Sequence, residues 1–284
     1  MIEQIIVNGL LASLIYVMMA LGFTLIFGIM RIVNFAHGEF YMVGAVTVLM
    51  LFGQMGWPFF AAVIAGGLLS ALLGMAVEKL LFRPLMGNEL SGMIMSLAVG
   101  ITLQALASIL FGPDEQTTER PFSGTWTLMS ATVPWDRTVV ALCSLAALAV
   151  FYLFLKYSRL GLAMQAVAQD PSTASLMGIE SGRIYVSAFG IACLLAGLAG
   201  SLMAPIYTVS PYMGELPMLK AFVIVILGGL GSLAGAVLGS FLMGLSESGL
   251  TTFYGSTVSL IASFVIVILV VMARPNGLMG RGTR

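Results

Sequence analysis

The sequence has very little charge for its length. Only 8% of its 284 residues are Asp, Glu, Lys or Arg, against roughly 25% in an ordinary soluble domain. Hydrophobic residues make up 60% of the chain, and the mean hydropathy is +1.06. This composition excludes a soluble globular domain and is typical of a protein that crosses a membrane several times. Because the chain has 12 basic and 12 acidic residues, its net charge does not indicate nucleic-acid binding.

Residues that ligate metals or act as nucleophiles are also scarce. The chain has one histidine, His37, and two cysteines, Cys143 and Cys193, which lie in separate apolar runs, so we expect neither a metal site nor a disulfide. The lysines lie in the sequences EKLL, LKYS and LKAF, so no GxxxxGK[S/T] phosphate-binding loop is present. No GxSxG nucleophile motif occurs. We therefore expect a protein that is not an enzyme and that binds no cofactor itself.

The apolar segments predict an all-α fold, a polytopic transmembrane helical bundle of about eight or nine spans. Two of the segments, 40–52 and 218–229, are only about a dozen residues long, and we expect them to be short, broken or re-entrant helices. The full set of predicted segments is 5–30, 40–52, 59–82, 91–111, 138–155, 184–207, 218–229, 233–252 and 258–272.

The basic residues predict which ends of these segments face the cytoplasm. If the polar loop 156–183 is cytoplasmic, Arg120 and Arg137 lie outside among acidic residues, Lys220 is ambiguous, and the remaining basic residues lie inside. With nine crossings this places the C-terminus in the cytoplasm and the N-terminus outside. Trp57, Trp126 and Trp135 then lie at the outer interface. The cytoplasmic set is Arg31, Lys79, Arg83, Lys156, Arg159, Arg183, Arg274, Arg281 and Arg284.

The two short segments begin with similar sequences. His37-Gly38-Glu39-Phe40 opens the first, and Met213-Gly214-Glu215-Leu216 opens the second, about 175 residues later. We predict a single transmembrane domain over 1–284 with an inverted repeat, in which residues 5–111 and 184–273 correspond and an odd number of crossings separates them; such repeats are typical of transporters. Residues 138–155 form the linking span and 156–183 the cytoplasmic loop. The alternative is chance similarity between two apolar, glycine-rich stretches.

The loop 156–183 contains a short predicted helix with clear start and stop signals. Asp170 suits the N-cap, Pro171 the first helical position and Gly178 the C-terminal glycine. A short capped helix with an apolar edge on the basic side of a membrane protein favours a docking element over a plain linker.

Polar residues within apolar segments are candidates for a translocation pathway, because ionisable groups at membrane depth are costly and usually face a bundle interior or a watery path. The alternative for the first cluster is an interfacial arrangement in which Arg31 pairs with Glu39. The alternative for Glu247 is a hydrogen bond between helices. The hypothetical pathway contacts are Asn34, His37, Glu39, Glu215 and Glu247.

Three glycines spaced by four residues, Gly231, Gly235 and Gly239, predict a ridge of small residues that packs against another helix.

Three stretches carry a resemblance to a known family. NGLLASLIYVMMALGFTLIFGIMRIVNFAHGEFYMVGA, AVAQDPSTASLMGI with GRIYVSAFGIACLLAGLAGSL, and VIVILGGLGSLAGAVLGS resemble the permease subunits of branched-chain amino acid ABC importers. The resemblance covers nearly the whole chain. One position departs from it, because Gln165 stands where family members commonly carry a basic residue. The resemblance implies that the coupling helix, which would contact the ATPase, contains Asp170, Pro171, Ala174, Met177, Gly178 and Ile179.

The resemblance also implies the partners and the place of this chain. They are a second homologous permease, two ATP-binding subunits that hold ATP and Mg²⁺, and a periplasmic substrate-binding protein, all at the bacterial inner membrane. The solute would be a branched-chain amino acid or a related small polar molecule such as urea, an amide or a small organic acid. Two other classes stay open: a secondary carrier driven by an ion gradient, with Glu39 and Glu247 as coupling carboxylates, and a membrane scaffold or sensor that transports nothing.

Overall fold

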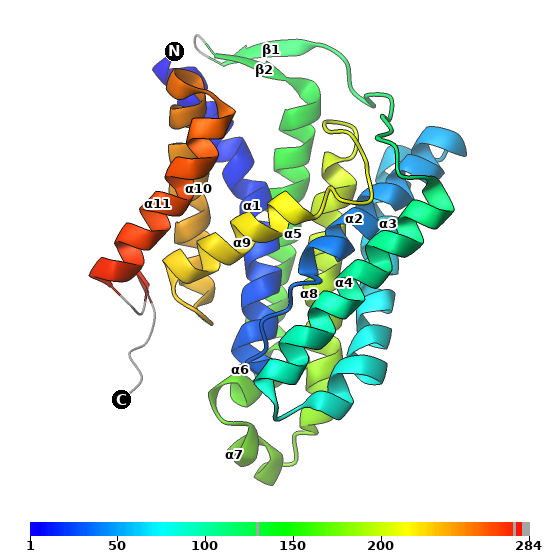
Figure 1. Cartoon of the computed structure of the whole chain (residues 1–284), viewed down its shortest axis with the longest axis vertical. Coiled ribbons are helices and arrows are strands. Elements are labelled where there is room, and N and C mark those ends of the chain that lie inside the picture. The colour runs from blue at the N-terminus through cyan, green and yellow to red at the C-terminus, as the bar shows by residue number, and fades with distance from the viewer. Residues whose placement is uncertain (129–130, 275–276, 280–284) are drawn as a thin grey trace.

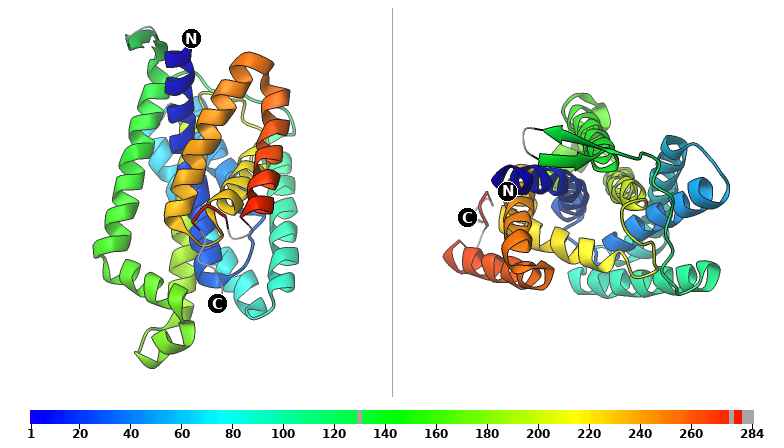
Figure 2. Two further views of the ribbon diagram at one scale, coloured as in Figure 1. Left: turned by 90° about the vertical axis from the view of Figure 1, so that its left-hand side faces the viewer. Right: turned by 90° about the horizontal axis from the view of Figure 1, so that it is seen from above.

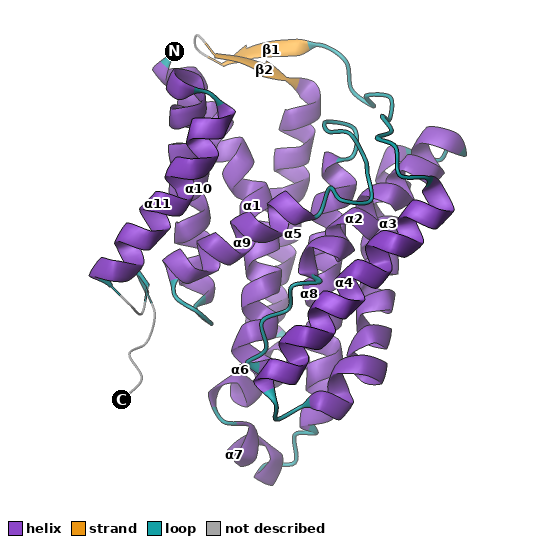
Figure 3. Cartoon of the chain, in the orientation of Figure 1, coloured by secondary structure: helices purple, strands orange, loops and turns teal. Residues whose placement is uncertain are grey.

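The structure is a computed structural model that describes residues 1–128, 131–274 and 277–279 (Figures 1 and 3). Its described part is a bundle of helices with one small β-hairpin, which confirms the all-α, polytopic prediction. Arg281 and Arg284, which entered the prediction of sidedness, lie outside the described residues. The helices are α1 (Ile2–Met30), α2 (His37–Val48), α3 (Phe59–Val77), α4 (Glu89–Phe111), α5 (Trp135–Tyr157), α6 (Arg159–Gln169), α7 (Pro171–Leu176), α8 (Ser181–Met203), α9 (Glu215–Gly228), α10 (Leu233–Tyr254) and α11 (Ser256–Ala273).

Six of the described helices are long and apolar enough to cross a membrane: α1, α3 with its extension to Leu85, α4, α5, α8 and α10. The count is lower than the predicted eight or nine spans mainly because two apolar helices are short: α2 has 12 residues and α9 has 14. At 1.5 Å per residue, a helix of 14 residues covers about 21 Å, less than the roughly 30 Å of a bilayer core. α9 lies obliquely at mid-height of the bundle (Figure 1).

Two helices continue in a wider helical form before their turns. α2 is followed by a π-helix, Leu49–Gln54, and α3 by a π-helix, Glu78–Phe82, and then by a 3₁₀ turn, Arg83–Leu85. A π turn shifts the face that the following residues present, and such turns are uncommon. No sequence pattern predicts these two π-helices.

The core is built around α1 and α8. α1 packs mainly on α10 and α8, while α8 packs on α3 and α2. Small residues let these helices approach closely: a Cβ added at Gly44 of α2 would overlap the backbone of Gly197 in α8. In the view from above, α1, α5, α8 and α9 surround the centre of the chain (Figure 2).

The connection before α5 contains an antiparallel hairpin that the sequence did not predict. Its strands are β1 (Thr125–Leu128) and β2 (Ala131–Pro134), with Thr125 opposite Pro134. The Gln4 side chain donates to the carbonyl of Thr132 at 3.0 Å and accepts from its N–H at 2.9 Å, so the start of α1 is tied to the hairpin. We call this end of the bundle the hairpin end, and the opposite end, where α6 and α7 project, the α7 end (Figure 1).

The predicted repeats meet at the two short helices. A Cβ added at Gly38 would overlap the carbonyl oxygen of Gly214, and one added at Gly214 would overlap that of Gly38. The N-terminal ends of α2 and α9 therefore touch through backbone alone. The boundaries of the repeats stay a prediction.

Candidate functional site

A cavity of about 370 Å³ lies in the half of the bundle nearer the hairpin. This volume is at the small end of the range typical of ligand pockets. Residues of α1, of α9 and of the segment between α8 and α9 form most of its wall. Single residues of α2, α8 and the connection after α4, with two of α5, complete it. The lining residues are Asn8, Leu11, Ala12, Ile15, Tyr16, Met19, Tyr41, Glu115, Arg137, Val140, Met203, Ile206, Tyr207, Thr208, Ser210, Met213, Leu216, Pro217 and Lys220.

The cavity runs along α1. Its lining residues on this helix extend from Asn8 to Met19, which corresponds to about 16 Å at 1.5 Å per residue. Asn8 lies near the hairpin end, where Glu115 and Arg137 also line the cavity and are exposed. Tyr16 and Met19 lie deeper in the bundle. The walls between these two levels are mainly aliphatic.

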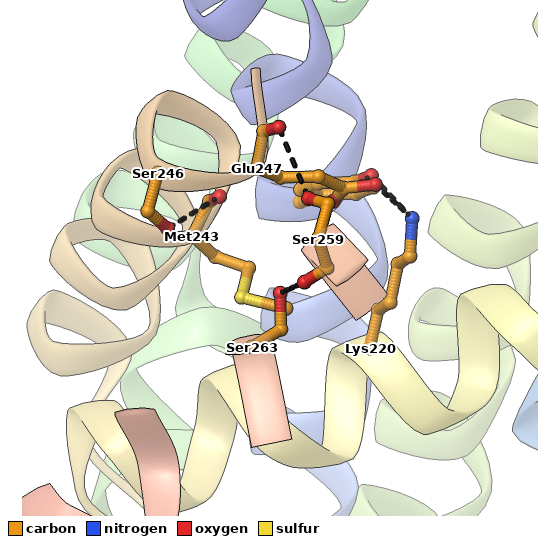
Figure 4. A network of polar contacts seen from close by, with 7 residues as sticks. Lys220, Met243, Ser246, Glu247, Ser259 and Ser263 are labelled. Atoms are coloured by element: carbon orange, nitrogen blue, oxygen red, sulfur yellow. Dashed lines mark hydrogen bonds and ion pairs between the residues drawn. The ribbon is translucent and has the colours of Figure 1, made fainter. Parts of the chain in front are cut away.

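A charged network closes the deep part of the cavity. Lys220 Nζ of α9 lies 2.6 Å from Glu247 Oε1 of α10 and donates to the hydroxyl of Tyr16 of α1 at 2.9 Å. The Tyr16 hydroxyl donates to Glu247 Oε2 at 2.7 Å. The Lys220 and Glu247 side chains are 18% and 23% exposed, so the ion pair is largely removed from solvent. One cation, one carboxylate and one hydroxyl thus join α1 to α9 and α10. Figure 4 shows the Lys220–Glu247 pair.

The backbone around Glu247 is held by α11. Ser259 Oγ donates to the carbonyl of Glu247 at 3.1 Å, and Ser263 Oγ donates to the carbonyl of Ser259 at 2.8 Å (Figure 4). α11 therefore fixes the turn of α10 that carries the carboxylate.

Below the network, towards the α7 end, aromatic side chains fill the bundle. The Phe23 ring lies 6.0 Å from the rings of both His37 and Phe222, edge to face. His37 is fully buried, and its Nε2 lies 3.2 Å from the carbonyl oxygen of Met19, a residue that lines the cavity. Phe23, His37 and Phe222 form a plug between the cavity and the α7 end.

The other hypothetical pathway residues lie away from the cavity. Gln104 of α4 donates its side-chain amide to Glu39 Oε1 at 2.9 Å and to Glu215 Oε1 at 3.3 Å. Asn34 accepts from the N–H of Ala36 at 3.1 Å and so shapes the entry into α2. The structure brings Glu39 and Glu215 together, and it brings Glu247 and His37 close to the cavity.

The alternative in which Arg31 pairs with Glu39 is wrong. Among the described residues the ion pairs are Arg120–Asp136, Arg183–Glu180 and Lys220–Glu247. Arg31 is exposed and takes a left-handed conformation, φ 55°, at the C-terminus of α1, where its N–H donates to the carbonyl of Phe27. This geometry turns the chain away from α1 and separates the guanidinium from Glu39.

α7 has a hydrogen-bonded cap at each end. Asp170 accepts from the N–H groups of Ser172 and Thr173 and from both of their hydroxyls, which holds the pKa of its carboxyl well below the usual range. At the other end Gly178, φ 86°, donates to Ser175 O, and the N–H of Ile179 donates to Ala174 O. These two backbone hydrogen bonds together form a Schellman motif.

The C-terminal end of α7 exposes two large apolar side chains. Leu176 is 88% exposed and Met177 is 80% exposed, whereas Ala174 is buried. Large apolar side chains at the tip of a projecting element mark a contact surface when they are exposed together. Pro171 begins the helix at its first position.

Gln165 has a definite structural contact. Its side-chain amide donates to the carbonyl of Leu155 at 2.6 Å, in the last turn of α5. It thereby joins α6 to α5 and fixes the angle at which the α7 loop leaves the bundle.

The glycines of the predicted ridge differ in position. A Cβ added at Gly235 would overlap the carbonyl of Gly228, and one added at Gly239 would lie 2.8 Å from the carbonyl oxygen of Ile224, so both allow α10 to approach α9. Gly231 precedes α10, with φ 80°, and belongs to the turn between the two helices.

Sequence reasoning missed two members of the network. The pattern of basic residues places Lys220 on neither side of the membrane, and no sequence motif singles out Tyr16. A signal was present, because a lysine and a glutamate in two apolar segments are expected to pair with one another at membrane depth.

The chain is similar to transport proteins over nearly its full length. Residues 5–273 match the family described as "Branched-chain amino acid transport system / permease component". The chain is 31% identical to the high-affinity branched-chain amino acid transport system permease protein LivH of Escherichia coli, over 96% of this chain and 94% of that one. It is 31% identical to the corresponding protein BraD of Pseudomonas aeruginosa, over 98% and 95%.

A second type of permease is also similar. The chain is 27% identical to the permease protein LivM of Escherichia coli, over 94% of this chain and 68% of that one. The family match and the two relatives at 31% identity agree with the resemblance seen in the sequence. The chain therefore belongs to the family of permease components of branched-chain amino acid transport systems.

Proposed function

We propose that this chain is one of two membrane-spanning subunits of a bacterial ABC importer. The importer moves branched-chain amino acids, or a related small polar solute such as urea, an amide or a small organic acid, into the cytoplasm. Its other parts are a second homologous permease, two ATP-binding subunits and a periplasmic substrate-binding protein. The existence of LivH and LivM as two related permease proteins in one organism supports the pairing with a second permease.

The observation that carries this proposal is the geometry of α7. It is a rigid, doubly capped helix that projects beyond the bundle and presents Leu176 and Met177 to solvent (Figure 1). A motor protein that binds these side chains can move the helix, and through α6 and α8 the bundle, as one body. The direct neighbours of α7 along the chain, α6 and α8, both contact the core.

The orientation follows from the basic residues. Arg31, Arg83, Lys156, Arg159 and Arg183 lie at the ends of helices on the α7 side, which is therefore the cytoplasmic side in this proposal. The hairpin end and the N-terminus then face the periplasm, and the cavity opens towards the binding protein. Transport requires the plug of Phe23, His37 and Phe222 to part when the ATP-binding subunits push on α7, a rigid-body switch between outward and inward access.

The test is a change of one exposed methionine at each end of the bundle. Met177→Asp is expected to abolish co-purification of the ATP-binding subunits and ATP-driven uptake in proteoliposomes, because a carboxylate cannot occupy an apolar groove without losing its hydration. Met55→Asp, at a 63% exposed methionine, is the matched control and is expected to retain the ATP-binding subunits. Equal retention by both variants would contradict docking through α7.

Uptake by the same proteoliposomes also distinguishes the importer from a secondary carrier and from a scaffold or sensor. Uptake that needs the ATP-binding subunits and ATP supports the importer. Uptake by the lone chain under a proton gradient would identify a secondary carrier instead. No uptake by either route, with solute import unchanged in cells that lack the chain, would identify a scaffold or sensor.

A further inference from the structure

The cavity has a cation at its deep end, Lys220, and one of its N–H groups has no acceptor among the described residues. An ammonium group has three N–H bonds. In Lys220, Glu247 and the hydroxyl of Tyr16 each accept one of them. Lys220 also lines the cavity, together with Tyr16, whereas Glu247 lies outside the cavity lining. The positive member of the ion pair is therefore the one that faces the cavity.

The surroundings of Lys220 make it energetically unfavourable to leave this N–H group without an acceptor. The walls beside it are formed by Ile15, Met19 and Leu216, and the pair is largely removed from solvent. A charged donor in such surroundings is stabilised by an anionic acceptor far more than by an apolar wall. Ionisable groups at membrane depth that face a cavity commonly mark the path of a solute.

We infer that Lys220 binds the carboxylate of the transported solute. The inference rests on the proposed function and narrows its solute class. The carboxylate is held by the third N–H of Lys220, and the aliphatic part lies against Leu11, Ile15 and Val140, which line the cavity. Solutes of this class are small aliphatic carboxylates, α-amino acids included. Urea and neutral amides lack the group that Lys220 recognises.

A purely structural role is the competing explanation. The network joins α1, α9 and α10, and an ion pair in this place could serve only to hold these helices together. The two explanations differ in what happens when both charges are removed. A structural pair can be replaced by two apolar side chains with little loss of stability. A carboxylate site loses its ligand after the same replacement.

The experiment uses a reporter cysteine inside the cavity. Cys143 and Cys193, the free cysteines of the described residues, are changed to alanine, and Ala12→Cys places a thiol on the cavity wall one helical turn from Tyr16. The rate of thiol alkylation is measured in nanodiscs with three probes of similar shape: L-leucine, 4-methylpentanoate, which lacks the amine, and L-leucinamide, which lacks the carboxylate.

L-Leucine and 4-methylpentanoate are expected to slow the alkylation, and L-leucinamide is expected not to. Lys220→Met should raise the half-protecting concentration of L-leucine about tenfold or more, the typical effect of losing one hydrogen bond to a charged group. Lys220→Arg should retain much of the protection. Equal protection by L-leucinamide, or no protection by either carboxylate, would overturn the inference.

The double variant Lys220→Met with Glu247→Leu controls for misfolding. It is expected to elute and melt like the parent protein and still to lose protection by L-leucine. Protection that survives in this variant would assign the pair a structural role only.

The alkylation needs neither ATP nor partner subunits, so it is independent of the uptake assay. If uptake does not require ATP but L-leucine still protects, the importer proposal fails and the carboxylate site stands. If uptake requires ATP but L-leucine protects the Lys220→Met variant as well as the parent, the carboxylate site fails and the importer proposal stands.

Discussion

Two acidic clusters lie within the bundle, and they differ in their partners. Glu247 is paired with a cation, Lys220, and accepts a hydrogen bond from the hydroxyl of Tyr16. Glu39 and Glu215 share only the neutral amide of Gln104. The first cluster adjoins the cavity through Lys220, while the second lies between α2, α4 and α9 and lines none of that cavity.

The comparison shows that a carboxylate at membrane depth is not by itself a sign of a solute path. Glu39 and Glu215 each lie in the first turn of a short helix, where the positive end of the helix dipole favours a negative charge. That environment explains them without a ligand. Glu247 is near the middle of α10 and needs its cation, and it is the cation that reaches the cavity.

The backbone contact beside the second cluster, which holds Glu39 and Glu215 near each other, should be the most sensitive point. Gly38 precedes Glu39 and touches Gly214, which precedes Glu215. Gly38→Val is expected to lower stability by about 3 kcal/mol or more, because its Cβ would overlap the carbonyl of Gly214 and approach Met218 Cβ at 2.7 Å. Thermal unfolding followed by size-exclusion chromatography measures the effect.

Gly249→Val is the matched control for that change. Gly249 is also in a helix, α10, but the nearest atom to its added Cβ is Ile5 Cγ2 at 3.8 Å. It is expected to melt close to the parent protein. If both variants melt at the same temperature, α2 and α9 do not meet as described.

The same isosteric change in the two clusters should have different effects. Glu247→Gln is expected to cost about 1.5 kcal/mol of stability, because Lys220 loses its charge partner. Glu39→Gln is expected to be within about 0.5 kcal/mol of the parent, since the partner of Glu39 is the neutral amide of Gln104, which can donate equally to a glutamine carbonyl. Thermal melts of the two variants in one detergent provide the comparison, and equal losses would contradict it.

A third acid, Asp170, is exposed to solvent, and the cap that it forms should change least of the three when the pH is varied between about 8 and about 5. Its folded-state pKa is lowered by hydrogen bonds from Ser172 and Thr173. A lowered pKa gives a stabilisation that is complete above the unfolded value of 3.8 and is lost as the pH falls through the folded value. Hydrogen exchange at the Thr173 amide should therefore keep the same protection between about pH 8 and about pH 5. A loss of protection within that window would show that the cap is not an ionised carboxylate.

Local features of the fold could be predicted from the sequence. The ends of α7 depend on residues within three or four positions of each other, namely Asp170, Pro171 and Gly178, and the caps are found there. The short lengths of α2 and α9 could likewise be seen from the apolar runs alone. These properties need no knowledge of the rest of the chain.

Features that depend on the arrangement of helices could not be predicted in the same way. Lys220 and Glu247 lie on different helices, and Tyr16 is more than 200 positions from Lys220, so their contact depends on packing. The choice of Asn34, Glu39 and Glu215 as pathway contacts followed from their polarity, which does not determine the face on which a side chain lies. The hairpin was missed because its four-residue strands are too short to show a periodic pattern.

The cavity is lined from Asn8 of α1 to Lys220 of α9, and Lys220 belongs both to its wall and to the charged network. Any sliding of α9 against α1 therefore changes two things together, the shape of the deep end of the cavity and the length of the Lys220–Tyr16 hydrogen bond.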